Sequence, residues 1–330
     1  MLNVCIVGCG ARGKGHAQEW QKRKNSRVVA VCDALEDRLR ALAEETGASA
    51  YVDWRDAVLH EGVDVVSICT PSHSHADITC LAAENGRHVF GEKPMALTVE
   101  QGEIMLDCTR RAGVVYMPCF QYRDMGVYRR YRELFQAHRF GGPVVFRFTD
   151  IREVRPKTAM HSRSANGGPI VDMACHVFDL MRWITGEEAI RVYASGGVFG
   201  KGKPRLAEIA DLAIDQAVVE VTMRGGHQLH AYFNWGMPED FPGVSSEQWM
   251  VGPELAARPA DGNMEVLCAD HRELWPLGEN PGTGRRVERM VQAIHGESAP
   301  DITGEDALAA LRISHMALES IETGQAVEVG

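Results

Sequence analysis

A glycine-rich turn near the N-terminus constrains the fold of this chain more than any other feature. The apolar run from Leu2 to Val7 predicts a strand, and the sequence G-C-G-A-R-G follows it directly, where a helix is expected to begin. In a G-x-G-x-x-G turn between strand and helix, the glycines allow a tight turn, a close approach to a pyrophosphate and close helix packing. Phosphates are favoured by the free N–H groups and the dipole at the helix start. The turn predicts a dinucleotide site made by Gly8, Gly10, Ala11, Arg12 and Gly13.

An acid at the expected spacing strengthens this prediction and selects the cofactor. A second apolar strand, from Arg27 to Cys32, ends at Asp33, twenty residues after Gly13. A carboxylate there accepts hydrogen bonds from the ribose 2′-hydroxyl and repels a 2′-phosphate. The next residue, Ala34, offers no cation for such a phosphate. We therefore predict that the cofactor is NAD rather than NADP.

Strand and helix signals continue to alternate up to about residue 120. This alternation is typical of a parallel sheet with helices on both faces. It predicts an NAD-binding Rossmann domain over residues 1–120, with six strands. The further strands are expected near 50–52, 63–70, 88–91 and 114–119, and the further helices at 35–46, from Trp54, and at 98–111.

Two short polar segments follow predicted strands of this sheet. Ligands of open α/β sheets bind at the carboxyl ends of the strands, so Thr70, Pro71 and His75 are predicted to contact the cofactor. Glu92 and Lys93 follow the next strand and should lie near the nicotinamide, where a lysine could stabilise an alkoxide. The alternative for His73 and His75 is a pair of exposed imidazoles at a helix start. The alternative for Glu92 is an ion pair with a neighbouring cation, which would leave Lys93 solvated.

The pattern changes after residue 120. A helix at 128–138 is followed by alternating segments with glycine-rich turns, which indicate antiparallel strands. We expect a second domain at 121–330. The fold class is thus α/β, with an N-terminal Rossmann domain and a C-terminal α+β domain that carries a large open, mostly antiparallel sheet. Strands are expected at 143–150, 190–198, 213–222, 228–235, 247–251 and 264–268, with a short one at 326–329. Helices are expected at 284–295 and 305–322, and the terminal helix (about 303–323) could pack on the first domain.

The segment from Gly167 to Asp179 predicts a helix that carries polar side chains on one face. Two glycines and Pro169 form a loop that ends at a helix start. Asp172 and His176 are four residues apart, so they would lie one turn apart on that helix. An acid can orient the imidazole and favour its charged form, which suits a general base near neutral pH. The alternative is an aspartate favoured by the helix dipole beside an unrelated core histidine.

Composition and charge exclude several functions. The net charge is −10 without a basic block, which argues against a nucleic-acid partner. No apolar run approaches the roughly 20 residues that span a bilayer, so we expect a cytoplasmic protein without membrane contact. The nine cysteines include no C-x-x-C pair, and most follow apolar runs as small buried residues. We expect no metal, because one helix cannot direct Asp172, Cys175, His176 and Asp179 at one ion.

The long basic segment from Arg152 to Gly168 is a candidate substrate loop. Loops of that length within a compact domain are usually functional, although solvent exposure of most of its charges is the simpler interpretation. A sugar acid or sulfonate is one substrate class that Arg152, Arg155 and Arg163 would suit. The candidate substrate residues are Arg152, Arg155, His161, Tyr232 and Asn234.

Together these motifs resemble those of the Gfo/Idh/MocA oxidoreductases, the family of glucose-fructose oxidoreductase and inositol 2-dehydrogenase. The resemblance covers nearly the whole chain. It rests on the glycine turn, Thr70-Pro71 with His75, Glu92-Lys93-Pro94, the Gly167-Gly168 segment with Asp172 and His176, and the terminal helix ending at Thr323-Gly324.

The resemblance implies a six-stranded NAD domain followed by a domain at 121–330 for substrate binding and oligomerisation. The open sheet of that second domain is commonly used for dimer or tetramer contacts. It also implies that Lys93 and His176 are catalytic, that Asp172 binds substrate and supports the pair, and that the Lys93–Pro94 bond is cis. The substrate would be a carbohydrate: an inositol, a pyranose or a glycoside, oxidised at a secondary hydroxyl. Two alternatives stay open, an NAD-dependent glycoside hydrolase acting through transient oxidation and elimination, and a non-catalytic NAD-sensing protein.

Overall fold

The computed structural model describes residues 1–241, 247–278 and 280–329. The chain divides into two compact units. Unit 1 contains residues 1–121 and 281–308, and unit 2 contains residues 122–280 and 309–330.

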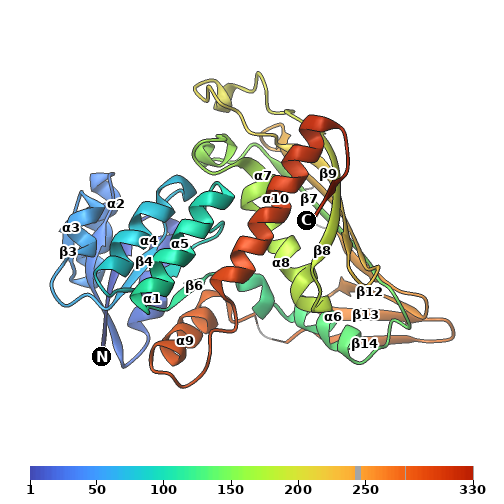
Figure 1. Ribbon diagram of the computed structural model, residues 1–330, viewed down its shortest axis with the longest axis horizontal. Helices are drawn as coiled ribbons and strands as arrows, with labels where there is room; N and C mark the ends of the chain where they lie inside the picture. The colour runs from blue at the N-terminus through green and yellow to red at the C-terminus, as the bar shows by residue number, and fades with distance from the viewer. Residues whose placement is uncertain (242–246, 279, 330) are drawn as a thin grey trace. The chain divides into compact units, whose positions relative to one another are not determined.

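Unit 1 is built on a six-stranded parallel sheet (Figure 1). Its strand order is β3-β2-β1-β4-β5-β6, so the direction of winding reverses between β1 and β4. In such sheets ligands bind outside the carboxyl ends of the strands at that reversal. The predicted six-strand Rossmann sheet is therefore confirmed. Its strands are β1 (Leu2–Val7), β2 (Ser26–Cys32), β3 (Ser49–Tyr51), β4 (Val65–Ile68), β5 (His88–Gly91) and β6 (Tyr116–Pro118).

The helices of unit 1 bury apolar side chains against the sheet. Trp20 of α1 packs edge-on against Phe90 of β5, and both are fully buried. Local signals set the ends of the helices: Thr98 and Gln101 form a capping box at the start of α5, and Gly113 ends it in the left-handed conformation. The helices are α1 (Ala11–Gln21), α2 (Glu36–Thr46), α3 (Trp54–Val58), α4 (His75–Glu84), α5 (Val99–Ala112) and α9 (Gly282–Ile294).

Unit 2 is built on a nine-stranded mixed sheet in the order β14-β13-β12-β11-β7-β10-β9-β8-β15. β7 and β10 pair in parallel and the other neighbours are antiparallel, as expected for a mostly antiparallel open sheet. Because β7 and β10 run in the same direction, the residues at their C-terminal ends lie at one edge. The strands are β7 (Val145–Glu153), β8 (Ala189–Gly197), β9 (Gln216–Met223), β10 (Gln228–Met237), β11 (Gln248–Val251), β12 (Leu255–Ala260), β13 (Asn263–Cys268), β14 (Arg272–Pro276) and β15 (Val327–Glu328).

The predicted elements of unit 2 are found with two omissions. The sequence analysis missed β12 and β14, whose runs contain Pro259 and the alternating charges of R-E-L-W-P. Both strands lie near one end of the sheet. Few of their side chains are fully buried there, so their sequences contain too few large apolar residues to show a strand pattern. The helices of this unit are α6 (Gly126–Gln136), α7 (Gly168–Asp172), α8 (Ala174–Thr185) and most of α10 (Gly304–Thr323), which is shown in red in Figure 1.

Cysteine use is partly as expected. Five cysteines that lie in or directly after apolar runs are buried and form no disulfide: Cys5, Cys9, Cys32, Cys69 and Cys119. Cys80 and Cys108 form a disulfide between α4 and α5, which the sequence analysis did not anticipate. Among the described residues, every helix is too short or too polar to cross a membrane.

Candidate functional site

The glycine turn has the geometry that a dinucleotide requires. Gly8 has a φ of +98°, and a Cβ there would lie 2.7 Å from the carbonyl carbon and oxygen of Cys69. A Cβ on Gly13 would lie 1.7 Å from the Gly8 carbonyl oxygen. Only glycine fits at these two positions, so α1 starts directly against the ends of β1 and β4. The first turn of α1 contains no acid that would repel a phosphate.

Asp33 stands at the end of β2, where the sequence analysis predicted it. Its Oδ2 accepts a hydrogen bond from the Cys9 amide at 2.7 Å, and its Oδ1 accepts one from Leu35 at 2.8 Å. The carboxylate is therefore held beside the glycine turn in one orientation. This is the position from which it can accept hydrogen bonds from a ribose.

A pocket beside the turn is lined by two cationic side chains that the sequence analysis missed, Lys14 and Arg38. Its volume is about 250 Å³, and it lies between the glycine turn and α2. The Arg38 guanidinium lies 3.9 Å from the ideal Cβ position of Gly10. Arg38 follows Asp33 by five residues and lies in the first turn of α2. A cation at that position is the sequence signal that could have identified it. The lining residues are Cys9, Lys14, Asp37, Arg38, Ala41, Leu42 and Glu45.

His75 connects the loops after β4 and β5. It is only 2% exposed, and its ring nitrogens lie 3.0 Å from the carbonyl oxygens of Thr70 and Pro94. Burial lowers the pKa of His75, and the neutral ring can donate to one of the two carbonyls at a time. The alternative of an exposed imidazole holds for His73 and is wrong for His75. Whether His75 also contacts the cofactor stays a prediction.

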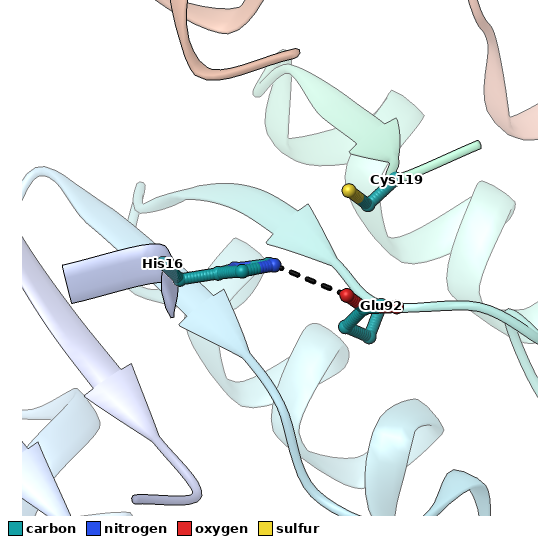
Figure 2. A group of neighbouring side chains, drawn as sticks. All are labelled: His16, Glu92 and Cys119. Carbon is teal, nitrogen blue, oxygen red and sulfur yellow. Dashed lines mark hydrogen bonds and ion pairs between the residues drawn. The ribbon is translucent and has the colours of Figure 1, made fainter. Parts of the chain in front are cut away.

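Glu92 is held by a buried histidine. Its Oε1 lies 3.2 Å from Nε2 of His16 (Figure 2). The Nδ1 of His16 lies 2.9 Å from the Ser67 hydroxyl. Its Oε2 accepts a hydrogen bond from the Lys93 amide at 3.2 Å. Burial alone would raise the pKa of Glu92, but the hydrogen bond and charge of His16, with the charge of Arg12, hold it at about 2. Glu92 is thus an ionised anchor for Lys93.

His16, Glu92 and Cys119 also form a set of possible metal ligands, with their ligand atoms within 4.8 Å of one another. In Figure 2 the imidazole and the carboxylate point toward each other, and the Cys119 thiol lies to one side of that contact. Both ring nitrogens of His16 have protein partners. This arrangement fits a buried hydrogen bond between His16 and Glu92, which in turn orients Lys93. The Lys93–Pro94 peptide bond is cis, as predicted.

In unit 2, two adjacent glycines form the start of the helix that was predicted to carry the catalytic residues. Gly167 and Gly168 both have positive φ, and a Cβ on Gly168 would lie 2.7 Å from the Ala213 Cβ. The predicted single helix is divided: α7 ends at Asp172, and α8 begins after Met173. The His176 amide donates to the Met173 carbonyl at 3.1 Å, three residues back, so the backbone is tighter than an α-helix here. Asp172 and His176 are each 2% exposed.

Two neighbouring residues brace α8, and the sequence analysis missed both. The Tyr122 ring stacks on the His176 imidazole, with the centroids 4.1 Å apart. The guanidinium of Arg123 forms a buried ion pair with Asp179, one turn further along α8, with Nε donating to Oδ2 at 2.8 Å. Asp179 is therefore committed to a structural pair. A Y-R dipeptide carries no sequence signal of this kind, because the contacts are long-range.

The substrate candidates gather at the C-terminal ends of β7 and β10. Arg152 forms hydrogen bonds with Asp150 at 2.8 and 2.9 Å, and the amide of Arg155 donates to Nε2 of His161 at 2.9 Å. Asp172 lies within electrostatic reach of both arginines. Asn234 donates to the Tyr232 hydroxyl at 3.1 Å, and its carbonyl oxygen accepts from Gly236.

The predicted residues thus form two groups, one in each unit. Unit 1 holds the glycine turn, Asp33, Thr70, Pro71, His75, Glu92 and Lys93, and unit 2 holds Asp172, His176 and the substrate candidates. A role in binding or catalysis for any of these residues stays a prediction.

Comparisons with known proteins agree with this architecture. Residues 2–120 match the oxidoreductase family with an NAD-binding Rossmann fold, and residues 128–252 match the GFO/IDH/MocA C-terminal domain. A solved levoglucosan dehydrogenase in complex with NADH has the same fold, with a TM-score of 0.87 and 21% identity, over 100% of this chain and 99% of that one.

Two curated relatives align along nearly the whole length. An inositol 2-dehydrogenase of Rhizobium meliloti is 30% identical, with 98% of each chain covered. A D-glucoside 3-dehydrogenase of Escherichia coli is 28% identical, over 99% of this chain and 97% of the relative. The sheet order, the glycine turn and these matches lead to one conclusion: the chain belongs to the GFO/IDH/MocA family of NAD-binding oxidoreductases.

Proposed function

We propose that this protein oxidises a secondary hydroxyl of a cyclic polyol or sugar and uses NAD as the acceptor. The observation that carries the proposal is the burial of an aspartate and a histidine on successive helices, Asp172 at the end of α7 and His176 in the first turn of α8. Buried ionisable groups are costly to retain, and such groups gather where they serve chemistry. Relatives named as inositol and glucoside dehydrogenases support the same substrate class.

His176 is proposed as the general base. Its imidazole accepts the proton of the reacting hydroxyl, which oxidation of an alcohol requires. Tyr122 holds the ring plane by stacking, so the imidazole is oriented before substrate binds. Asp172 binds a substrate hydroxyl and favours the protonated imidazole that results from the transfer.

Lys93 is proposed to stabilise the oxygen that loses this proton. An ammonium group beside a developing alkoxide lowers the energy of the transition state more than that of the alcohol. The ionised Glu92 and the cis bond to Pro94 set the backbone from which the lysine side chain extends. Bound NAD supplies the acceptor for the hydride.

The test is NADH formation by the purified protein with NAD and a panel of inositols, aldoses and glycosides. We expect steady NADH production with at least one ring polyol or sugar. Glycoside cleavage that requires NAD but accumulates no NADH would contradict this proposal and indicate a redox-assisted hydrolase. Absence of both reactions and of NADH binding would contradict any catalytic role.

A further inference from the structure

Arg155 differs from the other arginines at the edge formed by β7 and β10. Arg152 is paired with Asp150, and Arg205 is paired with Glu239. Asp150 also accepts a hydrogen bond from the Trp235 indole at 2.8 Å, so its oxygens are occupied. Among residues 1–241, 247–278 and 280–329, Arg155 has no carboxylate within ion-pair distance, and its Nε is buried without a hydrogen-bond partner.

The surroundings of Arg155 make an anion favourable there. Its guanidinium carbon lies 6.0 Å from the ring centre of Trp235, at the outer limit of a cation–π contact. Burial and the charge of Arg152 lower the pKa of Arg155, while the weaker effects of Asp150, Asp172 and Glu153 act in the opposite direction. A half-buried guanidinium beside a second cation is stabilised by an anion that binds it directly.

His161, which contacts the Arg155 backbone, adds a neutral hydrogen-bond donor. Its Nε2 accepts the Arg155 amide, so the neutral ring carries its proton on Nδ1. Burial and Arg155 lower the pKa of His161 to about 4, which keeps the ring neutral at pH 7. The residue is 1% exposed, and among the described residues Nδ1 has no hydrogen-bond partner. A buried N–H donor without a partner is costly and is a place for an acceptor from a ligand.

These groups lie next to the proposed catalytic residues of unit 2. Asp172 acts electrostatically on both Arg155 and Arg152, and Tyr122, which stacks on His176, acts on Arg152. The short helix at Thr158–His161 packs against α7, which ends at Asp172. A ring bound at His176 therefore has Arg155 and His161 as neighbours for one of its substituents.

We propose that the substrate is a carboxylated ring, such as a uronic acid or a related sugar acid, whose carboxylate is bound by the Arg155 guanidinium and the Nδ1–H of His161. This inference rests on the proposed function, because it assigns the substrate class of the same site. A guanidinium can bind a carboxylate through two parallel N–H bonds.

The experiment measures binding, so that it does not depend on turnover. The protein with saturating NADH is titrated with D-glucuronate, D-galacturonate, D-glucose and the isosteric neutral amide D-glucuronamide, and affinity is followed by calorimetry. We expect at least one uronate to bind at least tenfold more tightly than glucose and glucuronamide. Equal affinity of the uronates and the amide, or no binding of either uronate, would overturn the inference.

Matched variants assign the effect to Arg155. Arg155→Gln should weaken uronate binding by about 10²-fold and change glucose binding less than threefold, as expected for loss of one partner of a buried charge pair. Arg155→Lys should retain part of the preference for the acid. Arg163→Gln removes an exposed cation of the same loop and should have no effect. If the uronate preference survived Arg155→Gln, or fell equally in Arg163→Gln, the assignment would be wrong.

The two proposals fail in different ways. A protein that forms NADH from a neutral sugar but binds uronates no better than their amides refutes the carboxylate inference alone. A protein that binds uronates selectively through Arg155 but forms no NADH with any polyol or uronate refutes the proposed function, while the anion site stands.

Discussion

The phenol ring of Tyr122 lies parallel to the imidazole of His176, with 4.1 Å between the ring centroids and 6° between the planes. Tyr128 stacks on Tyr122 in turn, at 5.3 Å and 14°. The next residue after Tyr122 is Arg123, which pairs with Asp179. One short segment thus fixes both the ring plane of the proposed base and the helix that carries it.

Removal of the stacking ring should misorient the base. We expect Tyr122→Leu to lower kcat about 3- to 10-fold, because an aromatic stack contributes about 0.5–1.5 kcal/mol. Tyr122→Phe keeps the ring and should stay within twofold. The measurement is kcat as a function of pH. Misorientation of the base should shift the apparent pKa of this profile, whereas a purely structural loss would leave that pKa unchanged. Equal activity of the Leu and Phe variants would contradict the positioning role.

Loss of the proposed base should be far more severe. His176→Ala is expected to reduce kcat by about 10² to 10⁴-fold, the usual contribution of a general base. His230→Ala is the control, because His230 is an exposed histidine of β10 paired with Glu220. Initial rates of NADH formation and thermal unfolding are compared. Near-normal turnover in a folded His176→Ala protein would remove His176 from the mechanism.

Cofactor selectivity should depend on Asp33. Asp33→Ala removes the carboxylate that accepts hydrogen bonds from the ribose and repels a 2′-phosphate. We expect the affinity for NADH to fall about tenfold, since hydrogen bonds to charged groups contribute about 1.5–3 kcal/mol, and the preference over NADPH to shrink. Fluorescence titration with both nucleotides measures this. Asp56→Asn, an exposed acid on α3, should change neither affinity.

The Glu92 anchor predicts a pH dependence of stability. The folded pKa of about 2 lies below the ordinary value of 4.5, so the stabilisation is present above pH 4.5 and is lost as pH falls toward 2. Glu92→Gln should lower the free energy of unfolding at pH 7, and its difference from the wild type should shrink toward pH 2. Urea unfolding at a series of pH values tests this. Glu36→Gln, at an exposed surface pair with Arg40, should change it little.

Gly168, the first residue of α7, should tolerate no side chain. Gly168→Ala places a methyl group in the left-handed region and 2.7 Å from the Ala213 Cβ. Gly186→Ala is a matched control, because Gly186 has nearly the same φ, 72° against 71°, with no atom within 4 Å of its Cβ position. The control should cost about 1–2 kcal/mol for the backbone conformation. Gly168→Ala should cost about 1–3 kcal/mol more, from overpacking; equal losses in unfolding experiments would contradict the clash.

Much of this protein follows from its sequence alone because the relevant signals are local. Hydrophobic periodicity and turn residues predicted the six strands of unit 1, and the spacing from Gly13 to Asp33 predicted the acid at the end of β2. The cis bond before Pro94 followed from the family resemblance. The glycine pair at the start of α7 was also predicted, although the division of the helix at Met173 was not.

Other features were decided only by the tertiary structure. The partner of Glu92 is His16, 76 positions away, and the partner of His176 is Tyr122, 54 positions away, and neither pairing leaves a periodic trace in the sequence. The isolation of Arg155 depends equally on Asp150 being occupied by Arg152 and Trp235. Local sequence determines which residues can form a strand, a turn or a helix face. Which charges become paired when those elements pack is determined by contacts between distant parts of the chain, because burial makes each ionisable group depend on the partners that the fold brings to it.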